Sequence, residues 1–493
     1  MSPKLTRVLL VALVAYYGWV LASHGTGFAS GADGSGYYNL ARLLGQGRST
    51  ETLRPVPGIA MESYHPLLFT PLGFAPGHRP GRLVPVYPPG LPAHLALAAP
   101  IVGWDGAGVL VNTLAGMAAL LLVYHLARRL ELPREWALAA VVLFASFPVT
   151  FLYFTCLFSD GLATVWCCAA VACALAGRRS TGLAALAGFA FGVAVLVRPS
   201  AALLLPALLL ALGRRPRALL AFGAGGLPAA VALAGYNLAT YGQLLATGYP
   251  NLASEFRWAY FPPRVRHFGL WTARFWTPLV LLLWVGVLAG AARRDRRHLQ
   301  LVAWVVPFVV FYSFYYHSDR FWWYLRFLLP AMPAVLIGAL LVARQLQESA
   351  LRRWGMRRVG RVLVAGLLVG ATLWAASSSR HWIRFFRVSH LAAGDAEYPR
   401  GVAWMARQVP PDAAVACFQT SGAVYAYSRF PVIRYDILDP ASAARLGAEL
   451  RASRTPVFAL LFEVEEPDFR ARYGDAFVEL GRSGRSSLWR LRE

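Results

Sequence analysis

The chain has 493 residues, of which 57% are hydrophobic and only 15% are charged. That composition excludes an ordinary soluble protein and indicates many membrane spans. The formal net charge of +24 comes almost entirely from arginine, because Lys4 is the only lysine. The arginines cluster in short loops between apolar runs. This distribution is typical of topology signals and lipid contacts, and it argues against a nucleic-acid partner.

The apolar runs predict a polytopic α-helical membrane protein with about eleven transmembrane helices. The first run follows Lys4 and Arg7 and could be a cleaved signal peptide, but in a protein with so many spans we expect it to stay as an anchor. The runs lie near residues 6–22, 107–127, 136–152, 160–177, 181–197, 199–213, 218–237, 277–292, 299–315, 325–343 and 362–376. Four of the five cysteines fall in or beside an apolar run, and we interpret all five as small apolar residues.

The arginine clusters predict the orientation. By the positive-inside rule, the loops that carry them are cytoplasmic. The clusters lie at residues 128–134, 178–179, 214–217, 293–297 and 344–361. This parity requires that the short apolar stretch 88–103 does not cross, and we expect it to be a re-entrant or surface helix. If it crossed, every later arginine cluster would face outward.

On this topology the outer face carries two large loops, at residues 24–106 and 238–276, and juxtamembrane helices are expected in the first. Residues 1–390 would form the transmembrane domain, and residues 395–493 a small C-terminal α/β extracytoplasmic domain. Within the tail, the pattern predicts helices over 398–409 and 441–452 and strands over 414–418 and 456–462.

Acidic residues on the outer side are few. Only seven precede residue 390, and any outward-facing general base of the transmembrane domain must be among them: Asp33, Glu51, Glu62, Asp105, Asp160, Glu255 and Asp319. A charge at a membrane boundary costs free energy unless it has a task or a partner. Asp33 and Asp160 both lie where a loop meets a span. Either could instead be a turn residue, a cap or an N-terminal helix charge.

Outward basic residues are the second group of interest. Arg198 lies in a very short turn between two spans, and Arg320 and Arg326 flank the aromatic run 321–324. An arginine at an apolar boundary suits a phosphate by charge and by bidentate geometry. It can equally extend to lipid headgroups. The aromatic residues between the arginines could form an interfacial belt or stacking walls for a sugar ring.

Several short motifs occur in a fixed order along nearly the whole chain. They are Asp33 with Tyr37-Tyr38, the stretch 86–92, Tyr124-His125, Phe158-Ser159-Asp160-Gly161, the glycine-rich run that ends at Arg198-Pro199, residues 236–249, and residues 326–333. Each motif alone is weak. Through the ordered series the chain resembles the GT-C class of integral-membrane glycosyltransferases, in particular bacterial members of the protein O-mannosyltransferase and aminoarabinose-transferase group.

The resemblance implies an inverting transfer of a hexosyl or pentosyl group from a polyprenyl-phosphate-linked donor to an acceptor hydroxyl, with Asp33 as general base. Asp160 would orient the acceptor or hold a divalent cation, for which His267 is a weaker candidate. No cofactor is certain, and the acceptor could be a protein, a lipid or a cell-envelope glycan. The resemblance implies the bacterial cytoplasmic membrane, with the active site facing outward. Substrate contacts are expected from Tyr37, Tyr38, Tyr87, Arg82, Arg198, His267, Arg320 and Arg326.

The chain departs from the family pattern in one place. Some relatives carry a Glu-Lys pair where this sequence reads Val86-Tyr87. That difference puts a metal site there in doubt and moves the expected phosphate contact to Arg82, Arg198 or Arg326. The Trp-Trp-Asp motif of oligosaccharyltransferases is also absent from the sequence, which argues against peptide N-glycosylation.

Two other classes of function are consistent with a polytopic chain. A transporter or flippase of lipid-linked glycans should show repeated halves and charged residues near mid-span, and the sequence has neither. A membrane scaffold would use the C-terminal tail to bind a partner, and nothing in residues 395–493 indicates how.

Overall fold

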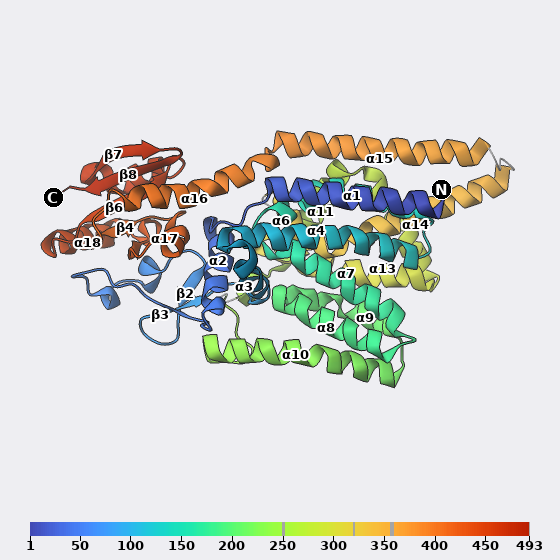
Figure 1. The fold of residues 1–493 in the computed structure, drawn as a ribbon, viewed down its shortest axis with the longest axis horizontal. Helices are drawn as coiled ribbons and strands as arrows, with labels where there is room; N and C mark the ends of the chain where they lie inside the picture. Colours follow the sequence, from blue (N-terminus) through green and yellow to red (C-terminus); the bar gives the residue numbers. More distant parts are fainter. Residues whose placement is uncertain (249–251, 319–320, 355–358, 493) are drawn as a thin grey trace.

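The computed structural model describes residues 1–248, 252–318, 321–354 and 359–492. A bundle of helices makes up most of the molecule, and an α/β region lies at one end of it, next to α2 and α3 (Figure 1). The bundle consists of α1 (Pro3–His24), α4 (Trp104–Arg129), α5 (Arg134–Ser146), α6 (Pro148–Thr155), α7 (Ser159–Gly177), α8 (Thr181–Val197), α9 (Leu205–Leu212), α10 (Pro216–Tyr241), α12 (Pro278–Ala292), α13 (Arg296–Ser313), α14 (Met332–Trp354) and α15 (Val359–Phe385).

Three further helices are short and lie outside the main runs: α2 (Gly31–Gly45), α3 (Gly90–Val102) and α11 (Phe261–Phe275). Among the 3₁₀ helices, η3 (Pro199–Leu204), η7 (Trp322–Ala331) and η9 (Tyr435–Ile437) matter below. The remaining short turns are η1 (Met61–Ser63), η2 (Pro66–Phe69), η4 (Leu252–Glu255), η5 (Trp258–Tyr260), η6 (Tyr316–Ser318), η8 (Val388–His390) and η10 (Gly474–Ala476).

The helices identify an integral membrane protein. Neither α8 nor α12 contains a charged residue, so their side chains suit contact with other helices or with lipid. Their backbone N–H and C=O groups are satisfied by the hydrogen bonds within each helix. Five described helical segments are long and apolar enough to cross a membrane, or up to seven if each of two bent pairs counts as one span. Each predicted run falls on helical segments, but the runs 136–152, 199–213 and 325–343 are each divided between two of them. The predicted number of eleven spans is not confirmed and stays a prediction.

The stretch 88–103 forms α3, a helix of 13 residues that ends where Gly103 adopts φ +75° and the chain continues into α4. A helix of that length is shorter than the ~20 residues that a span needs. The length of α3 is therefore consistent with the expectation that the stretch 88–103 does not cross the membrane.

The C-terminal region is built on a five-stranded sheet. Its strands are β4 (Ala414–Ala416), β5 (Val432–Ile433), β6 (Val457–Phe462), β7 (Phe477–Ser483) and β8 (Ser486–Leu491), in the order β5-β4-β6-β8-β7. The strand β4 runs parallel to β5 and β6, and β8 runs antiparallel to β6 and β7. The helices are α16 (Leu391–Ala406), α17 (Ser421–Tyr427), α18 (Pro440–Ala452) and α19 (Glu466–Tyr473). Each helix and strand predicted for the tail is present, but the helix predicted over 398–409 begins at Leu391 and ends at Ala406.

The sheet is covered on both faces. Alternate residues of β6 point to opposite sides, so Phe458 and Leu460 join one apolar core while Ala459 and Leu461 join the other. Buried residues of α16 and α17 belong to the first core, and buried residues of α18 and α19 belong to the second. This coverage explains why β6 reads as a continuous apolar run rather than as an alternating one.

The first outer loop contributes to both cores. Its own small sheet consists of β1 (Glu51–Thr52), β2 (Phe74–Pro76) and β3 (Arg82–Pro85), in the order β1-β3-β2. Phe74 packs in the first core and Phe69 in the second. The backbone N–H of Arg434 also donates to the carbonyl of Leu68 at 2.6 Å. The loop and the C-terminal region therefore pack against each other. The predicted division into residues 1–390 and 395–493 does not include these shared cores.

A close backbone approach fixes the end of α8. Gly90, the first residue of α3, packs so tightly there that an added Cβ would lie within 2.5 Å of backbone atoms of Leu196 and Val197. Only glycine allows two backbones to come this near. The contact matters because the next residue is Arg198.

We predict that Gly90→Ala destabilises the protein by about 1–3 kcal/mol, because the new methyl group overlaps backbone that cannot move as a side chain would. The control is Gly235→Ala on α10, where an added Cβ meets no atom within 4 Å and helix propensity improves. Thermal unfolding of the purified variants measures both changes. Equal melting temperatures for the two variants would contradict the close approach.

Candidate active site

Four charged residues from four separate elements meet at the ends of their helices. Asp33 lies in the first turn of α2, Asp160 in the first turn of α7, Arg198 directly after α8, and Arg326 in η7. They form two ion pairs. Nη1 of Arg198 lies 2.9 Å from Oδ1 of Asp160, and Nη1 of Arg326 lies 3.7 Å from Oδ1 of Asp33. We call these four residues the charge network; its formal charge is zero.

Local sequence explains why these side chains meet. An acid in the first turn of a helix interacts favourably with the positive end of the helix dipole, which suits both Asp33 and Asp160. Pro199 follows Arg198 and forces it out of helical backbone, so α8 stops and Arg198 adopts φ −153° and ψ 109°. The helix α7 packs against both α8 and η7, which brings Asp160 near both arginines.

The two acids differ in their access to solvent. The side chain of Asp160 is 1% exposed and its pair is tight, whereas that of Asp33 is 27% exposed and its pair is loose. Burial raises the pKa of Asp33, the guanidinium of Arg326 opposes that rise, and the carboxylate of Asp160 adds to it. An accessible carboxylate with a raised pKa is suited to accept a proton.

Aromatic rings surround Arg326. Its guanidinium carbon lies 5.1–5.8 Å from the ring centroids of Tyr153, Phe158, Tyr324 and Phe327. Cation–π attraction holds a guanidinium in such a position without using its N–H donors. Among the residues that the structure describes, Nε of Arg326 has no hydrogen-bond partner. Arg326 therefore keeps donor capacity that an anion could use.

Two tyrosines join the network to the loop before α3. The hydroxyl of Tyr37 donates to Oγ of Ser159 at 2.8 Å, and Ser159 precedes Asp160. The ring of Tyr37 lies 4.8 Å from that of Tyr87, centroid to centroid. The ring of Tyr87 in turn packs over Gly36, where a Cβ would overlap it. Of the predicted substrate contacts, Tyr37 thus lies beside Ser159, and Tyr87 packs behind it against Gly36.

Other predicted site residues lie elsewhere. The hydroxyl of Tyr38 donates to Oδ1 of Asp105 at 2.8 Å, and its ring packs against Tyr427, which favours a structural role. Arg82 is exposed on β3 and donates to Oγ1 of Thr52 at 2.8 Å. His267 is buried on α11 beside Phe268 and Trp271. Arg320 lies outside the described residues.

The residues around Asp160 do not suit a divalent cation. Its carboxylate already faces the guanidinium of Arg198. Within residues 1–248, 252–318, 321–354 and 359–492, no three His, Cys, Asp or Glu side chains gather as a metal site would require. Asp160 and His267 therefore stay weak candidates for a metal ligand, and we derive no step through a metal.

Asp395, which was not among the predicted site residues, lies on α16 beyond the last bundle helix. Burial raises the pKa of its carboxyl to about 6, and the nearby side chains of Ser30 and Thr26 oppose that rise. The hydroxyl of Tyr398, one turn further along α16, lies next to Gly31. These contacts hold the start of α2, which carries Asp33. The available signal was an acid directly after an arginine-rich segment.

Comparison with known proteins gives one match to a family and several to solved structures. A family model described as dolichyl-phosphate-mannose-protein mannosyltransferase matches residues 86–234, a range that contains Tyr87, Asp160 and Arg198. No curated protein matches the chain by sequence.

Three solved structures illustrate the fold. ArnT from Cupriavidus metallidurans, bound to undecaprenyl phosphate, matches with TM-score 0.60 and 15% identity over 99% of this chain and 98% of that one. The oligosaccharyltransferase of Archaeoglobus fulgidus, tethered with an acceptor peptide, matches with TM-score 0.54 and 12% identity over 94% and 70%. The mycobacterial arabinofuranosyltransferase AftD matches with TM-score 0.56 and 14% identity over 100% and 40%. The chain thus has the GT-C glycosyltransferase fold and resembles the ArnT and protein mannosyltransferase group.

We predict that Asp160→Asn and Arg198→Gln each destabilise the protein by about 3–5 kcal/mol, because each leaves one buried charge without its partner. The double variant should lose less than the sum of the two. Thermal unfolding of the four proteins gives the coupling free energy. Glu348→Gln, which removes a half-exposed pair with Arg344, is the control and should change stability by less than about 1 kcal/mol. Additive losses would show that the buried pair does not couple.

We predict a distinct pH dependence for Asp395. Its pKa is about 6 in the folded protein but about 3.9 in an unfolded chain. The native state therefore holds the proton to higher pH, and the wild type should lose about 2–3 kcal/mol relative to Asp395→Asn as the pH rises from about 4 to 6. Melting temperatures of the two proteins across pH 4–8 measure this loss, with Glu397→Gln on the same helix as control. A difference that does not vary with pH would refute it.

Proposed function

We propose that the protein is an inverting glycosyltransferase that moves a sugar from a polyprenyl-phosphate-linked donor to an acceptor hydroxyl, with Asp33 as general base. One observation carries the proposal: within a GT-C fold, Asp33 is the accessible and loosely paired acid of the charge network, and its partner Arg326 has an unused donor. The fold itself is compatible with this chemistry, since ArnT, which shares it, was solved with undecaprenyl phosphate.

The donor phosphate is assigned to Arg326. Its guanidinium is held by aromatic rings rather than by a tight carboxylate pair, so an incoming phosphate replaces only the 3.7 Å contact with Asp33. Arginine suits phosphate because its N–H donors match two oxygens at once. Neutralising the phosphate also makes it a better leaving group, since negative charge accumulates there as the bond to the sugar breaks. The polyprenyl tail remains in the bilayer beside the apolar helices.

Phosphate binding frees Asp33 for the chemical step. The acceptor oxygen forms a bond to the anomeric carbon, the bond from that carbon to the phosphate oxygen breaks, and the hydroxyl proton passes to the carboxylate of Asp33. Polyprenyl phosphate leaves with the electron pair. Attack from the face opposite the leaving group inverts the anomeric centre. Because the leaving group needs no proton once Arg326 neutralises it, the protein supplies one base and the alignment of two substrates.

Asp160 and Arg198 act as positioning residues in this scheme. Their tight pair fixes the start of α7, and the carboxylate of Asp160 contributes to the raised pKa of Asp33. Tyr37 is buried and donates to Ser159, and its ring packs on Tyr87, so these two tyrosines support the start of α7. The predicted topology puts this site on the outer face of a bacterial cytoplasmic membrane, and the acceptor class stays open among protein, lipid and glycan.

We predict that Asp33→Asn lowers turnover by about 10²–10⁴-fold, the usual contribution of a general base. The assay supplies reconstituted protein with undecaprenyl- and dolichyl-phosphate sugars and measures polyprenyl phosphate by mass spectrometry. The matched control is Glu62→Gln, an exposed acid of the same outer loop, which should retain full turnover. Undiminished turnover in Asp33→Asn would remove Asp33 as the base. No release from any donor by the wild type would favour a transporter of lipid-linked glycans instead.

A further inference from the structure

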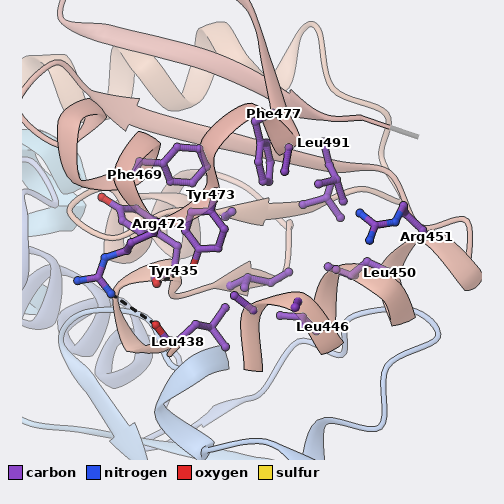
Figure 2. Close-up of a pocket in the computed structure, with 17 residues that line it drawn as sticks. Tyr435, Leu438, Leu446, Leu450, Arg451, Phe469, Arg472, Tyr473, Phe477 and Leu491 are labelled. Carbon is purple, nitrogen blue, oxygen red and sulfur yellow. Dashed lines mark hydrogen bonds between the residues drawn. The ribbon is translucent and has the colours of Figure 1, made fainter. Parts of the chain in front are cut away.

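The C-terminal α/β region contains a cavity of about 240 Å³ that is separate from the charge network (Figure 2). Its floor is the sheet face that carries Ala416, Ile433 and Val457. The helix α18 forms one wall, and α19 with the start of β7 forms the other. This face of the sheet belongs to the second apolar core, so the cavity is a space within that core that side chains do not fill.

Size and lining indicate a ring-shaped apolar group. An engineered apolar cavity of about 150 Å³ binds benzene, so one of about 240 Å³ has room for a group near two fused rings. Three aromatic rings meet along one wall: the centroid of Phe469 lies 4.9 Å from that of Tyr473 and 5.0 Å from that of Phe477. Leu446 and Leu450 face them from α18 (Figure 2). Aromatic walls of this kind gain most from an aromatic guest.

Most polar groups of the lining already have partners. The hydroxyl of Tyr435 donates to Oε1 of Glu465 at 2.9 Å, and that of Tyr473 donates to the carbonyl of Tyr435 at 2.8 Å. Nε of Arg472 donates to Oδ2 of Asp468 at 3.0 Å. These groups therefore offer a guest little hydrogen bonding, and the walls are effectively apolar.

Arg451 differs from the other polar groups. It lies at the opposite end of the cavity from Arg472 (Figure 2), and among the described residues no carboxylate pairs with it. The described lining also contains no acidic side chain. Arg451 is solvent-exposed, so the mouth of an otherwise apolar cavity carries a positive charge without a carboxylate partner among the described residues, and that charge complements an anion.

We propose that this cavity is a binding site for a small aromatic carboxylate, with its rings between α18 and α19 and its carboxylate paired with Arg451. The site does not depend on the glycosyltransferase proposal, because none of its residues belongs to the charge network. It gives the C-terminal region a ligand of its own, distinct from a lipid-linked sugar.

The test measures binding of 2-naphthoate to the full-length protein in phosphatidylcholine nanodiscs, by equilibrium dialysis with empty nanodiscs as blank. We expect saturable binding, and at least tenfold weaker binding of the neutral analogue 2-naphthamide, because a charge-assisted hydrogen bond is lost. Arg451→Gln should weaken naphthoate binding about tenfold or more while leaving naphthamide binding unchanged. Arg407→Gln, at the end of α16 on the other face of the sheet, is the matched control and should bind as the wild type does.

A second variant fills the cavity. An added Cβ at Gly447 on α18 would meet only the guanidinium nitrogens of Arg451, at 3.7–3.8 Å, so Gly447→Phe can place its ring in the cavity without moving backbone. This variant should abolish binding of both probes and keep the wild-type melting temperature or exceed it. If Gly447→Phe unfolds, Arg451→Gln decides alone. Equal affinity for the two probes, or unchanged naphthoate binding in Arg451→Gln, would overturn the proposal. Release of polyprenyl phosphate, measured separately, reports on the other activity.

Discussion

The ion pair between Arg198 and Asp160 joins the end of one apolar helix to the start of another, at a place where neither charge could remain alone. Everything around the charge network is arranged with respect to this pair. Ser159, next to Asp160, accepts the hydrogen bond of Tyr37, and Tyr37 lies one turn after Asp33 on α2. The pair therefore fixes the helix that carries the accessible acid.

The helix α2 is also held from the C-terminal side. Asp395 and Tyr398 on α16 contact the backbone and side chains at the start of α2. The side-chain amide of Asn39, further along α2, donates to the carbonyl of Gly422 on α17 at 3.0 Å. Bundle and C-terminal region thus hold α2 between them. Such support from two sides limits the freedom of a reacting carboxylate, which a transfer between two substrates requires.

The two acid–arginine pairs show how similar residues take different roles through packing. Asp160 lies 2.9 Å from Arg198 and has 1% exposure, so it is committed to its partner. Asp33 lies 3.7 Å from Arg326 and has 27% exposure, and aromatic rings rather than carboxylates hold Arg326 in place. The tight pair of Asp160 with Arg198 makes the site rigid. The longer contact of Asp33 with Arg326 can be replaced when an anion binds Arg326.

Sequence reasoning identified the members of the network but not its pairing. Asp33, Asp160, Arg198 and Arg326 each stand at the end of an apolar run, which composition reveals. Which arginine meets which acid depends on the packing of α7 against α8 and η7, and no local pattern encodes that. The cage of Tyr153 and Phe158 around Arg326 was hidden for the same reason.

Other predictions stay open because they relied on nearness in sequence. Tyr38 neighbours Tyr37, yet on a helix it points to a different side and reaches Asp105. Arg82 precedes a family motif but belongs to a small sheet, where it contacts Thr52. The number of spans depends on bends such as the 62° angle between α5 and α6, and hydrophobicity does not report a bend.

The two cores shared by the first outer loop and the C-terminal region have a consequence for the order of folding. The backbone N–H of Arg54 donates to the hydroxyl of Tyr425, a partner 371 residues later in the chain. During synthesis the loop emerges long before the sheet that covers its apolar side chains. Contacts of such long range form slowly, so the loop must wait in an uncovered state for the last strands. A ribosome that stops early would leave the helix bearing Asp33 in place but without the surface that completes it.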